Sequence, residues 1–523
     1  MKRKLRVRLA ACALAGALWL TACAAAQVQS DKSAGSEFEW RFSIKPNQTI
    51  SSGITAENRC RRHNRFEIDQ ETLPSFMRLS GKSSFNVDAR SKHVFPVRFD
   101  STGLAAGKYE SLVVIKCVTC RENGCSQDRQ SLHIYMTVEE QDAAQFVPNR
   151  VLVTIPFDSF DGVEAAAKKL AAAHGLALVE IHRLDSIHAA LIVYALPVGS
   201  DVTVKVAELA PEVLMAQPDY LYRTTGGGLG QTGSPATLQY GPKLIHADRL
   251  RSSLTGKGVR VAMIDTGIDI NHPALKGKIA EQFDTTGKGF TADVHGTLLA
   301  GIIASEPANS TGITGMAPGC EILAIKACQP ESPQSIQAQC SSLTLTRGLD
   351  LVLQKKARII NFSLSGPNDK LLLARLIDEA SNRGIVMIAA AGNDGPRGQP
   401  GYPAALPKVI AVTAVDANEQ LYSQATQGDF IALAAPGVEI VSTSPGGKLM
   451  VSSGTSFAAA FVTGISALIL EQQPQLSPAA LQSLLERTAK DLGRPGKDPQ
   501  FGSGLVDACK AVAQLRDDPK LCQ

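Results

Sequence analysis

The chain has 523 residues, of which 44% are hydrophobic and 20% are charged. This is more than one domain usually holds, and the apolar fraction can support several packed cores. The formal net charge is +4, but the first 22 positions hold five basic residues and no acidic ones, so the remainder carries −1. A near-neutral chain offers no electrostatic basis for binding nucleic acid, and we expect no such partner.

Residues 1–22 predict a secretory signal peptide, because basic residues are followed by a short apolar run and then by small residues. The next feature, LTAC, resembles the lipobox of bacterial lipoproteins, which implies cleavage before Cys23 and lipid attachment to it. Residues 23–36 would then be a lipid-anchored tether. This predicts an exported protein of the bacterial periplasm or outer membrane, held to the membrane by its lipid. Ordinary cleavage at a nearby alanine-rich site, giving a secreted protein, is the alternative.

Residues 37–140 predict a β-sandwich of immunoglobulin-like type. Runs such as FEWRFSI, HVFPVRF, SLVVIKC and SLHIYMTV alternate apolar and polar side chains between turn-rich stretches, as strands with one buried face do. No pattern here is typical of catalysis. A binding or spacer role is the default expectation, and the sequence does not identify a ligand.

Nine cysteines lie beyond the signal peptide and the lipid-attachment position, and in an exported chain they predict disulfide bonds. Five belong to the last part of the chain. There Cys328 with Cys340, and Cys509 with Cys522, would each close a short loop, which leaves Cys320 unpaired.

The other four cysteines belong to the predicted sandwich: Cys60, Cys117, Cys120 and Cys125. The run CVTCRENGC could instead hold a metal ion together with Cys60 or His63. An oxidising compartment favours the disulfide interpretation.

Residues 147–223 predict a βαββαβ unit of ferredoxin-like type. After a strand (RVLVTI), we expect a helix that begins with a capping box of Asp161 and Glu164 and ends at Gly175. Two strands, a short helix from Asp201 and a last strand (VLMAQ) complete the unit. Residues 224–238 are rich in Gly and Thr and predict a flexible, cleavable linker.

Residues 239–523 alternate strands and helices, which predicts a doubly wound α/β domain with a mainly parallel sheet. The expected strands are residues 260–264, 321–327, 358–363, 385–390 and 409–415. The expected helices are residues 295–304, 343–355, 370–383, 456–472 and 478–488.

Four polar residues of this region lie where predicted strands end or helices begin. Asp265 and Asn393 follow unbroken apolar runs, while His295 and Ser456 stand in the first turns of helices. A helix N-terminus favours the negative charge that a serine creates when it attacks a carbonyl. Each residue alone could be a cap, a helix-end histidine or a turn former. Together, at the sheet edge where open α/β sheets bind ligands, they predict a functional site.

The blocks AMIDTGID, HGTLLAGIIA and GTSFAAAFV, in this order, resemble the three signature blocks of the subtilisin-type serine proteases, the subtilases. NFSLSGP, AAAGNDG, GYPAAL, LAAPGVEIVST and FGSGLVDA extend the resemblance over residues 241–512. Leu298 stands where the family usually has a second histidine, and Ala460 where it usually has proline. Neither position belongs to the catalytic triad, so these departures concern the local helix geometry more than the chemistry.

The resemblance implies a serine endopeptidase. Ser456 would attack a peptide carbonyl, and His295 would take the proton and later hand it to the leaving amine. Asp265 would orient the imidazole, and Asn393 would donate a hydrogen bond to the oxyanion. This chemistry requires no cofactor. Calcium binding is common in the family, but the sequence shows no convincing cluster of ligands.

The resemblance also implies where a polypeptide substrate binds. An extended substrate would lie beside Ser363, Leu364 and Ser365 as an added strand. The pocket for the side chain that precedes the scissile bond would be lined by three small residues: Ala390, Gly392 and Gly401. Because no acidic residue is evident among them, we expect this pocket to prefer large apolar side chains such as Phe or Leu.

Residues 147–223 end in AQPDYLYR and precede the catalytic region, as the inhibitory propeptides of subtilases do. The resemblance implies that this propeptide-like unit is a partner in cis with its tail in the active site, so that the full chain is a zymogen. Two other functions stay open: a catalytically silent, lipid-anchored binding protein and a serine esterase. The natural substrate and the oligomeric state are not indicated.

Overall fold

The structure is a computed structural model that describes most of the chain in two compact units, residues 1–143 and 144–523. The described residues are 37–44, 49–74, 76–79, 82–100, 107–125, 129–138, 145–157, 159–230, 239–306, 312–367 and 371–522. The predicted signal peptide, the tether with Cys23, and residues 231–238 of the predicted linker lie outside them. The boundary between the units falls between the predicted sandwich and the predicted βαββαβ unit.

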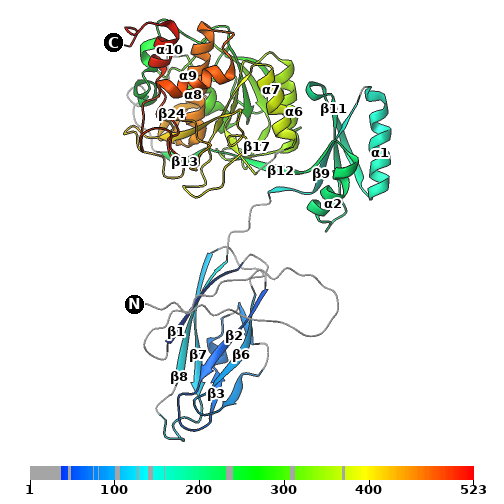
Figure 1. Cartoon of the computed structure of the whole chain (residues 1–523), viewed down its shortest axis with the longest axis vertical. Coiled ribbons are helices and arrows are strands. Elements are labelled where there is room, and N and C mark those ends of the chain that lie inside the picture. The colour runs from blue at the N-terminus through cyan, green and yellow to red at the C-terminus, as the bar shows by residue number, and fades with distance from the viewer. Residues whose placement is uncertain are drawn as a thin grey trace. The chain divides into compact units, whose positions relative to one another are not determined.

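The first unit contains two β-sheets (Figure 1). One has the order β1-β8-β7-β3-β5, in which β1 pairs with β8 in parallel, and the other has the order β2-β6-β4. The strands are β1 (Glu37–Ile44), β2 (Thr49–Glu57), β3 (Asn64–Ile68), β4 (Met77–Leu79), β5 (Ser84–Val87), β6 (Lys92–Asp100), β7 (Gly107–Cys117) and β8 (Arg129–Val138). Phe66 and Ile115 of the first sheet share one hydrophobic core with Val97 and Phe99 of the second. The immunoglobulin-like classification stays a prediction.

The four cysteines of the first unit form two disulfides, Cys60–Cys125 and Cys117–Cys120. Three of these sulfurs lie within 4.8 Å of one another. A metal site would need free thiolates, so the structure favours the disulfide interpretation over the metal alternative.

The second unit begins with the elements β9 (Phe146–Pro156), α1 (Val163–His174), β10 (Ala177–Leu184), β11 (Ala189–Ala195), α2 (Val202–Leu209) and β12 (Met215–Thr224). Their strands pair antiparallel in the order β10-β11-β9-β12. Asp201 caps α2 and Gly175 ends α1 in the left-handed conformation. The expected capping box of Asp161 and Glu164 is wrong: Asp161 lies in a 3₁₀ turn capped by Ser159, and α1 begins after Gly162.

The strand β12 is longer than the sequence pattern indicates and joins two parts of the unit (Figure 1). Its first half pairs with β9, and its second half pairs with β18 (Ala338–Ser341) and β20 (Leu364–Ser365). Apolar periodicity ends near Gln217, but backbone pairing with distant strands keeps the chain extended.

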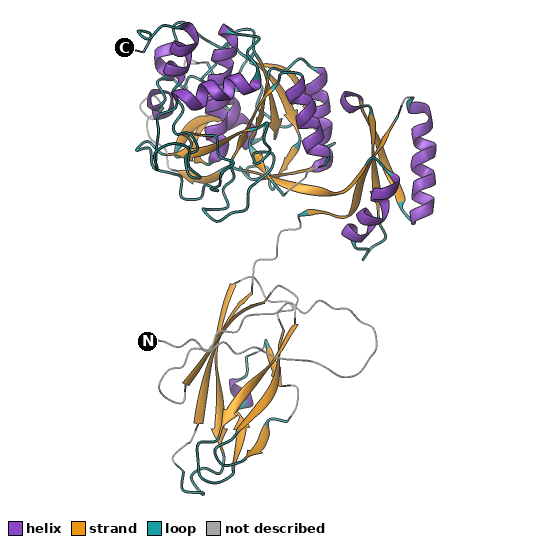
Figure 2. Cartoon of the chain, viewed as in Figure 1, coloured by secondary structure: helices purple, strands orange, loops and turns teal. Residues whose placement is uncertain are grey.

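The rest of the second unit is a seven-stranded parallel sheet with helices packed on it (Figure 2). Its order is β15 (Ile279–Asp284), β16 (Glu321–Lys326), β14 (Arg260–Asp265), β19 (Ile359–Phe362), β21 (Val386–Ala390), β22 (Ile410–Val415) and β23 (Leu433–Pro436). The main helices are α5 (Val294–Ala304), α6 (Ser342–Gln354), α7 (Leu372–Asn382), α8 (Thr455–Gln472), α9 (Pro478–Thr488) and α10 (Ala508–Arg516).

Alternate residues of the central strand β14 face two different cores. Val261 and Met263 pack in the core that contains α5 and α8, while Ala262 and Ile264 pack in the core that contains α6 and α7. A strand buried on both faces explains the unbroken apolar run before Asp265. The predicted doubly wound sheet is therefore present.

Helix α8 is the one described helix long and apolar enough to cross a membrane, and 89% of its 18-residue window is buried in the protein. The sequence pattern did not predict two of the hairpins. β24 (Ile440–Ser444) pairs with β25 (Lys448–Ser453), and β17 (Cys328–Pro330) pairs with β18.

Candidate active site

Ser456 lies in the first turn of α8, directly after the hairpin strand β25. The turn requires a glycine, because Gly454 has φ 153° and a side chain there would meet the carbonyl oxygen of Thr225. The Ser456 hydroxyl oxygen lies 3.2 Å from Nε2 of His295 and 2.8 Å from the hydroxyl of Thr225.

Asp265 and His295 meet at the carboxyl edge of the parallel sheet. Asp265 ends β14, His295 stands in the first turn of α5, and their Oδ1 and Nδ1 atoms are 2.7 Å apart. Because a carboxylate only accepts, Nδ1 donates its proton to Asp265, while Nε2 faces the Ser456 hydroxyl. Both residues and Ser456 are fully buried. The sequence predicted these three side chains at the ends of strands or the starts of helices. The fold brings them together, with His295 between Asp265 and Ser456.

Asn393 follows β21 and points its amide at the carbonyl oxygen of Thr225, to which Nδ2 donates a hydrogen bond. Its Oδ1 accepts hydrogen bonds from the N–H and the hydroxyl of Thr455, at 3.1 and 2.9 Å. Thr455 therefore fixes which end of the amide faces Thr225. No sequence motif assigned a separate role to Thr455, although it stands beside the predicted nucleophile.

The chain itself passes these residues as an extended strand. Arg223 and Thr224 of β12 pair with Ser365 and Leu364 of β20, and the Thr225 N–H donates to the Ser363 carbonyl oxygen at 3.1 Å. On its other side, β12 pairs with β18. A strand held between two edges is the geometry expected for a bound polypeptide.

Two of the three residues predicted to line the specificity pocket, Gly392 and Gly401, lie close to Ser365. A Cβ added to Gly401 would lie 1.8 Å from the Ser365 hydroxyl oxygen, and one added to Gly392 would lie 3.5 Å from it. Ala390 is fully buried at the end of β21. The hydroxyl of Ser363 donates to the carbonyl oxygen of Ser456 at 3.3 Å. The substrate-binding roles of these residues stay predictions.

A buried ion pair lies close to Asp265 and His295 in the fold. Nζ of Lys326 is 2.9 Å from Oδ2 of Asp293, and both side chains are almost wholly buried. Lys326 is the strand neighbour of Asp265, while Asp293 precedes the helix of His295 and accepts from the Gly267 N–H at 2.9 Å. The pair therefore ties together the two segments that carry Asp265 and His295. The sequence signal was a lone lysine in the apolar strand EILAIK.

Three polar side chain–backbone contacts dock the β9–β12 sheet on α6 and α7. Oδ1 of Asp219 accepts from the Leu343 N–H in the first turn of α6 at 2.9 Å, and Oε1 of Gln217 accepts from the Leu372 N–H of α7 at 3.2 Å. The Ser186 N–H donates to Asp350 at 3.0 Å. Burial raises the pKa of the Asp219 carboxyl, although hydrogen bonds from Leu343 and Arg150 oppose the rise.

The remaining cysteines follow the sequence prediction. Cys328–Cys340 and Cys509–Cys522 are disulfide-bonded, and Cys320 is free and buried. Burial raises the pKa of the Cys320 thiol to about 12, so this thiol stays protonated and unreactive at neutral pH. Within the described ranges, the only group of three or more His, Cys, Asp or Glu side chains close enough to share a metal ion is the disulfide-bonded cysteine group.

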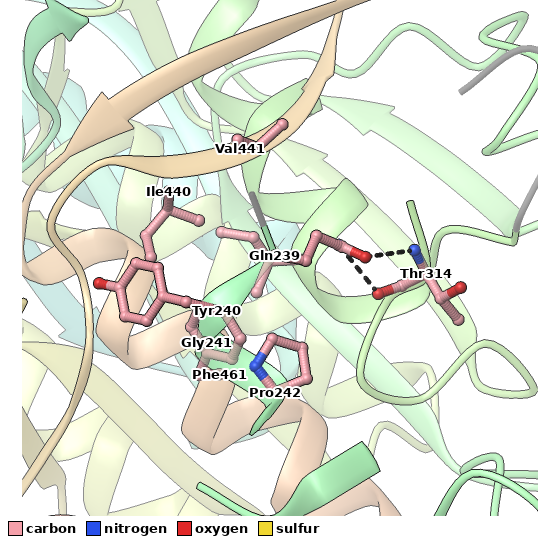
Figure 3. A pocket seen from close by; sticks show the side chains of 9 residues that line it. Gln239, Tyr240, Gly241, Pro242, Thr314, Ile440, Val441 and Phe461 are labelled. Atoms are coloured by element: carbon pink, nitrogen blue, oxygen red, sulfur yellow. Dashed lines mark hydrogen bonds between the residues drawn. The ribbon is translucent and has the colours of Figure 1, made fainter. Parts of the chain in front are cut away.

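A separate hollow lies where the described chain resumes after residue 238 (Figure 3). Tyr240 and Phe461 are among its lining residues, and none of the four predicted catalytic residues lines it. The Gln239 side chain pairs with the backbone of Thr314 through two hydrogen bonds, at 3.1 and 3.3 Å. This contact anchors the start of the parallel-sheet region.

The doubly wound sheet, with a buried serine, histidine and aspartate in contact at its edge, defines a serine peptidase fold. Residues 256–504 match the model of the Subtilase family. Subtilisin DY of Bacillus licheniformis is 36% identical over 288 residues, which cover 53% of this chain and 99% of that protein. Thermitase of Thermoactinomyces vulgaris is 35% identical over 280 residues, which cover 53% of this chain and 96% of thermitase. The chain therefore belongs to the subtilase family of serine proteases.

Among solved structures, fervidolysin from Fervidobacterium pennivorans, a keratinolytic enzyme related to subtilisin, is similar with a TM-score of 0.59. The sequence identity is 24%, and the match covers 71% of this chain and 62% of fervidolysin. At this identity the likeness concerns the fold alone.

Proposed function

We propose that this chain is a serine endopeptidase made as a zymogen, with Asp265, His295 and Ser456 as its catalytic triad. The observation that carries the proposal is the pair of contacts that His295 makes, at 2.7 Å to Asp265 and 3.2 Å to Ser456. His295 takes the proton of the Ser456 hydroxyl as its oxygen attacks a peptide carbonyl carbon. The Asp265 carboxylate stabilises the resulting imidazolium.

The oxyanion site of the proposal is the Asn393 amide. The carbonyl oxygen of Thr225 already accepts a hydrogen bond from it, so a carbonyl at this position would be stabilised as it becomes an oxyanion. Collapse of the tetrahedral intermediate breaks the C–N bond. The imidazolium then gives its proton to the leaving amine, and water hydrolyses the acyl-enzyme by the same steps.

We propose that the bond cut in maturation joins Thr225 to Gly226. Thr225 presents its carbonyl oxygen to Asn393 and its N–H to the backbone of Ser363. Gly226 lies against His295, since a Cβ added to it would be 2.8 Å from Cδ2 and 3.1 Å from Nε2 of the ring. His295, the proton donor, would thus stand on the side of the scissile bond where the Gly226 amine leaves.

The β9–β12 sheet would act as the inhibitor in cis. Its last strand pairs through its main chain with β18 and β20, and its contacts with α6 and α7 hold it in place. Covalent attachment gives the tail a high effective concentration at the site, which cleavage would lower. After the cut, the segment from Gly226 would remain joined to the protease at the Gln239 anchor.

The proposal includes export, on the basis of the signal-like first 22 residues and the disulfides. Lipid attachment at Cys23 rests on the LTAC resemblance. Mass spectrometry of the purified mature protein would test it, because the lipid adds mass to the peptide that begins at Cys23.

The main experiment compares the full chain with its Ser456→Ala variant. We expect the unmodified full chain to yield a fragment that begins at Gly226, to bind a fluorophosphonate at Ser456 and to hydrolyse peptides. The variant should stay uncut and unlabelled. Substantial peptide hydrolysis by rigorously purified Ser456→Ala protein would rule out the assignment, and turnover of esters without peptides would favour an esterase.

A further inference from the structure

We propose that the disulfide-closed hairpin of β17 and β18 selects substrates that carry a hydroxyl side chain, threonine or serine, at the second residue before the scissile bond. The inference rests on the proposed function, because it takes Thr225–Gly226 as the bond presented to Ser456. The substrate class is then a polypeptide in which Thr or Ser stands one residue before the residue whose carbonyl is attacked.

The observation is the environment of the Thr224 hydroxyl. Oγ1 accepts a hydrogen bond from the Ala338 N–H at 2.9 Å and donates one to the Ile336 carbonyl oxygen at 3.3 Å. Thr224 is only 7% exposed. Both partners are backbone groups of the hairpin, so one peptide donor and one peptide acceptor bind the same hydroxyl.

The strand register explains why a hydroxyl is needed there. The pairing of β12 with β18 ends at Arg223 with Gln339, and the next N–H along β18 is that of Ala338. Ala338 lies opposite Pro330 of β17, and the neighbouring Glu331 N–H donates to the Gln337 carbonyl oxygen, so the Ala338 N–H points away from β17 and toward Thr224. The Thr224 side chain therefore takes the place of a missing backbone partner.

The hairpin is held in shape before a substrate arrives. The Cys328–Cys340 disulfide joins its two strands, whose Cα atoms are 4.1 Å apart at that pair. At its tip, the Ser335 hydroxyl donates to the Gln337 carbonyl oxygen at 2.9 Å and accepts from the Gln337 N–H at 3.0 Å. The Ala338 N–H and the Ile336 carbonyl group therefore lose little conformational freedom when a substrate binds. This favours discrimination between side chains with and without a hydroxyl.

A substrate with valine in this position has the shape of threonine but lacks the hydroxyl. It would bury the Ala338 N–H and the Ile336 carbonyl oxygen without partners. An unsatisfied buried pair of this kind lowers the rate by about tenfold to a hundredfold. Serine keeps both hydrogen bonds, so its rate should stay close to that of threonine.

The first test uses the full chain and follows cleavage between Thr225 and Gly226 over time. Thr224→Val should slow the cut at least about tenfold, and Thr224→Ser should leave it within about threefold of the original. Equal rates for the threonine and valine chains would overturn the inference alone. A wild-type chain that shows no Ser456-dependent cut would overturn the proposed function and this inference with it.

The second test separates hydroxyl recognition from effects on folding. The processed protein would be given two matched peptides, Tyr-Arg-Thr-Thr-Gly-Gly and Tyr-Arg-Val-Thr-Gly-Gly, and the ratio of their kcat/KM values measured. Ala338→Pro removes the N–H donor, and Ala338→Gly keeps it as the matched control. We expect a ratio of at least about ten for the wild type and for the glycine variant, and a ratio near one for the proline variant. A preference for threonine that survives in Ala338→Pro would refute the assignment to this hairpin, because a general loss of stability affects both peptides equally.

Discussion

Thr455 holds the amide of Asn393 by two hydrogen bonds, one from its N–H and one from its hydroxyl, to the same Oδ1 atom. The opposite end of the amide therefore faces the carbonyl oxygen of Thr225. A donor that is oriented before the reaction needs no reorganisation when charge develops on the substrate oxygen.

We predict that Asn393→Ala lowers kcat for peptides by about 10² to 10³ with little change in KM, because the bond to the oxyanion is lost in the transition state. Thr455→Val should lower kcat by about tenfold, since the N–H bond to Asn393 remains. Thr455→Ser should restore activity. A valine variant with full activity would show that Thr455 does not orient the amide.

Asp219 should be the main polar anchor of the inhibitor. It is fully buried, accepts from the Leu343 N–H and pairs with Arg150 at 3.1 Å. We predict that Asp219→Ala weakens inhibition by the released β9–β12 fragment at least about tenfold, because the buried N–H of Leu343 at the start of α6 and the Arg150 guanidinium lose their acceptor. Titration of the processed protease with fragment measures the effect. Glu208→Ala, at an exposed position on α2, is the control and should inhibit normally.

The docked Asp219 also predicts a pH dependence of inhibition. Its pKa is raised when buried in the complex, above the ordinary value of about 3.9 that it would regain on release. The docked state therefore binds protons more readily, so this carboxyl favours docking most at low pH and loses that contribution as the pH rises through the raised pKa. The inhibition constant should therefore rise as the pH is raised from 4 to 7. The Asp219→Asn fragment should show a smaller rise. A slope that is unchanged in Asp219→Asn would assign it to another group.

The Lys326–Asp293 pair should matter for stability and for the alignment of the triad. Lys326→Met leaves a buried carboxylate unpaired, which should cost about 3–5 kcal/mol of unfolding free energy. The same variant should lower kcat, because Asp293 also holds the Gly267 N–H beside Asp265. The double variant Lys326→Met/Asp293→Asn should regain part of the lost unfolding free energy, which denaturant unfolding measures. A double variant no more stable than the single one would contradict pairing as the cause.

The specificity pocket is predicted to prefer large apolar side chains before the scissile bond, because its predicted lining residues, Ala390, Gly392 and Gly401, are small and include no acidic residue. A peptide library with varied residues at this position should give higher kcat/KM for Phe or Leu than for Lys or Arg. A clear preference for basic side chains would overturn this and point to a carboxylate near the cleft.

Much of the fold could be predicted from local patterns. The five expected strands of the parallel sheet and its five expected helices are present, with ends that shift by at most about two residues. Strands such as β14 are buried on both faces, so their sequence is continuously apolar and easily recognised. The edge strands β15 and β23, the hairpins and the second half of β12 were missed because their pairing partners, rather than their own composition, hold them extended.

The sequence by itself determined where Asp265, His295, Asn393 and Ser456 stand on their elements, because strand ends and helix starts have local signals. Only the tertiary structure decided which segment lies against these four residues and which contacts hold that segment. Thr225 meets Asn393 across 168 residues, and Asp219 meets Leu343 across 124. Contacts of such separation leave no period or motif in the chain, since they depend on how distant backbones come to lie side by side.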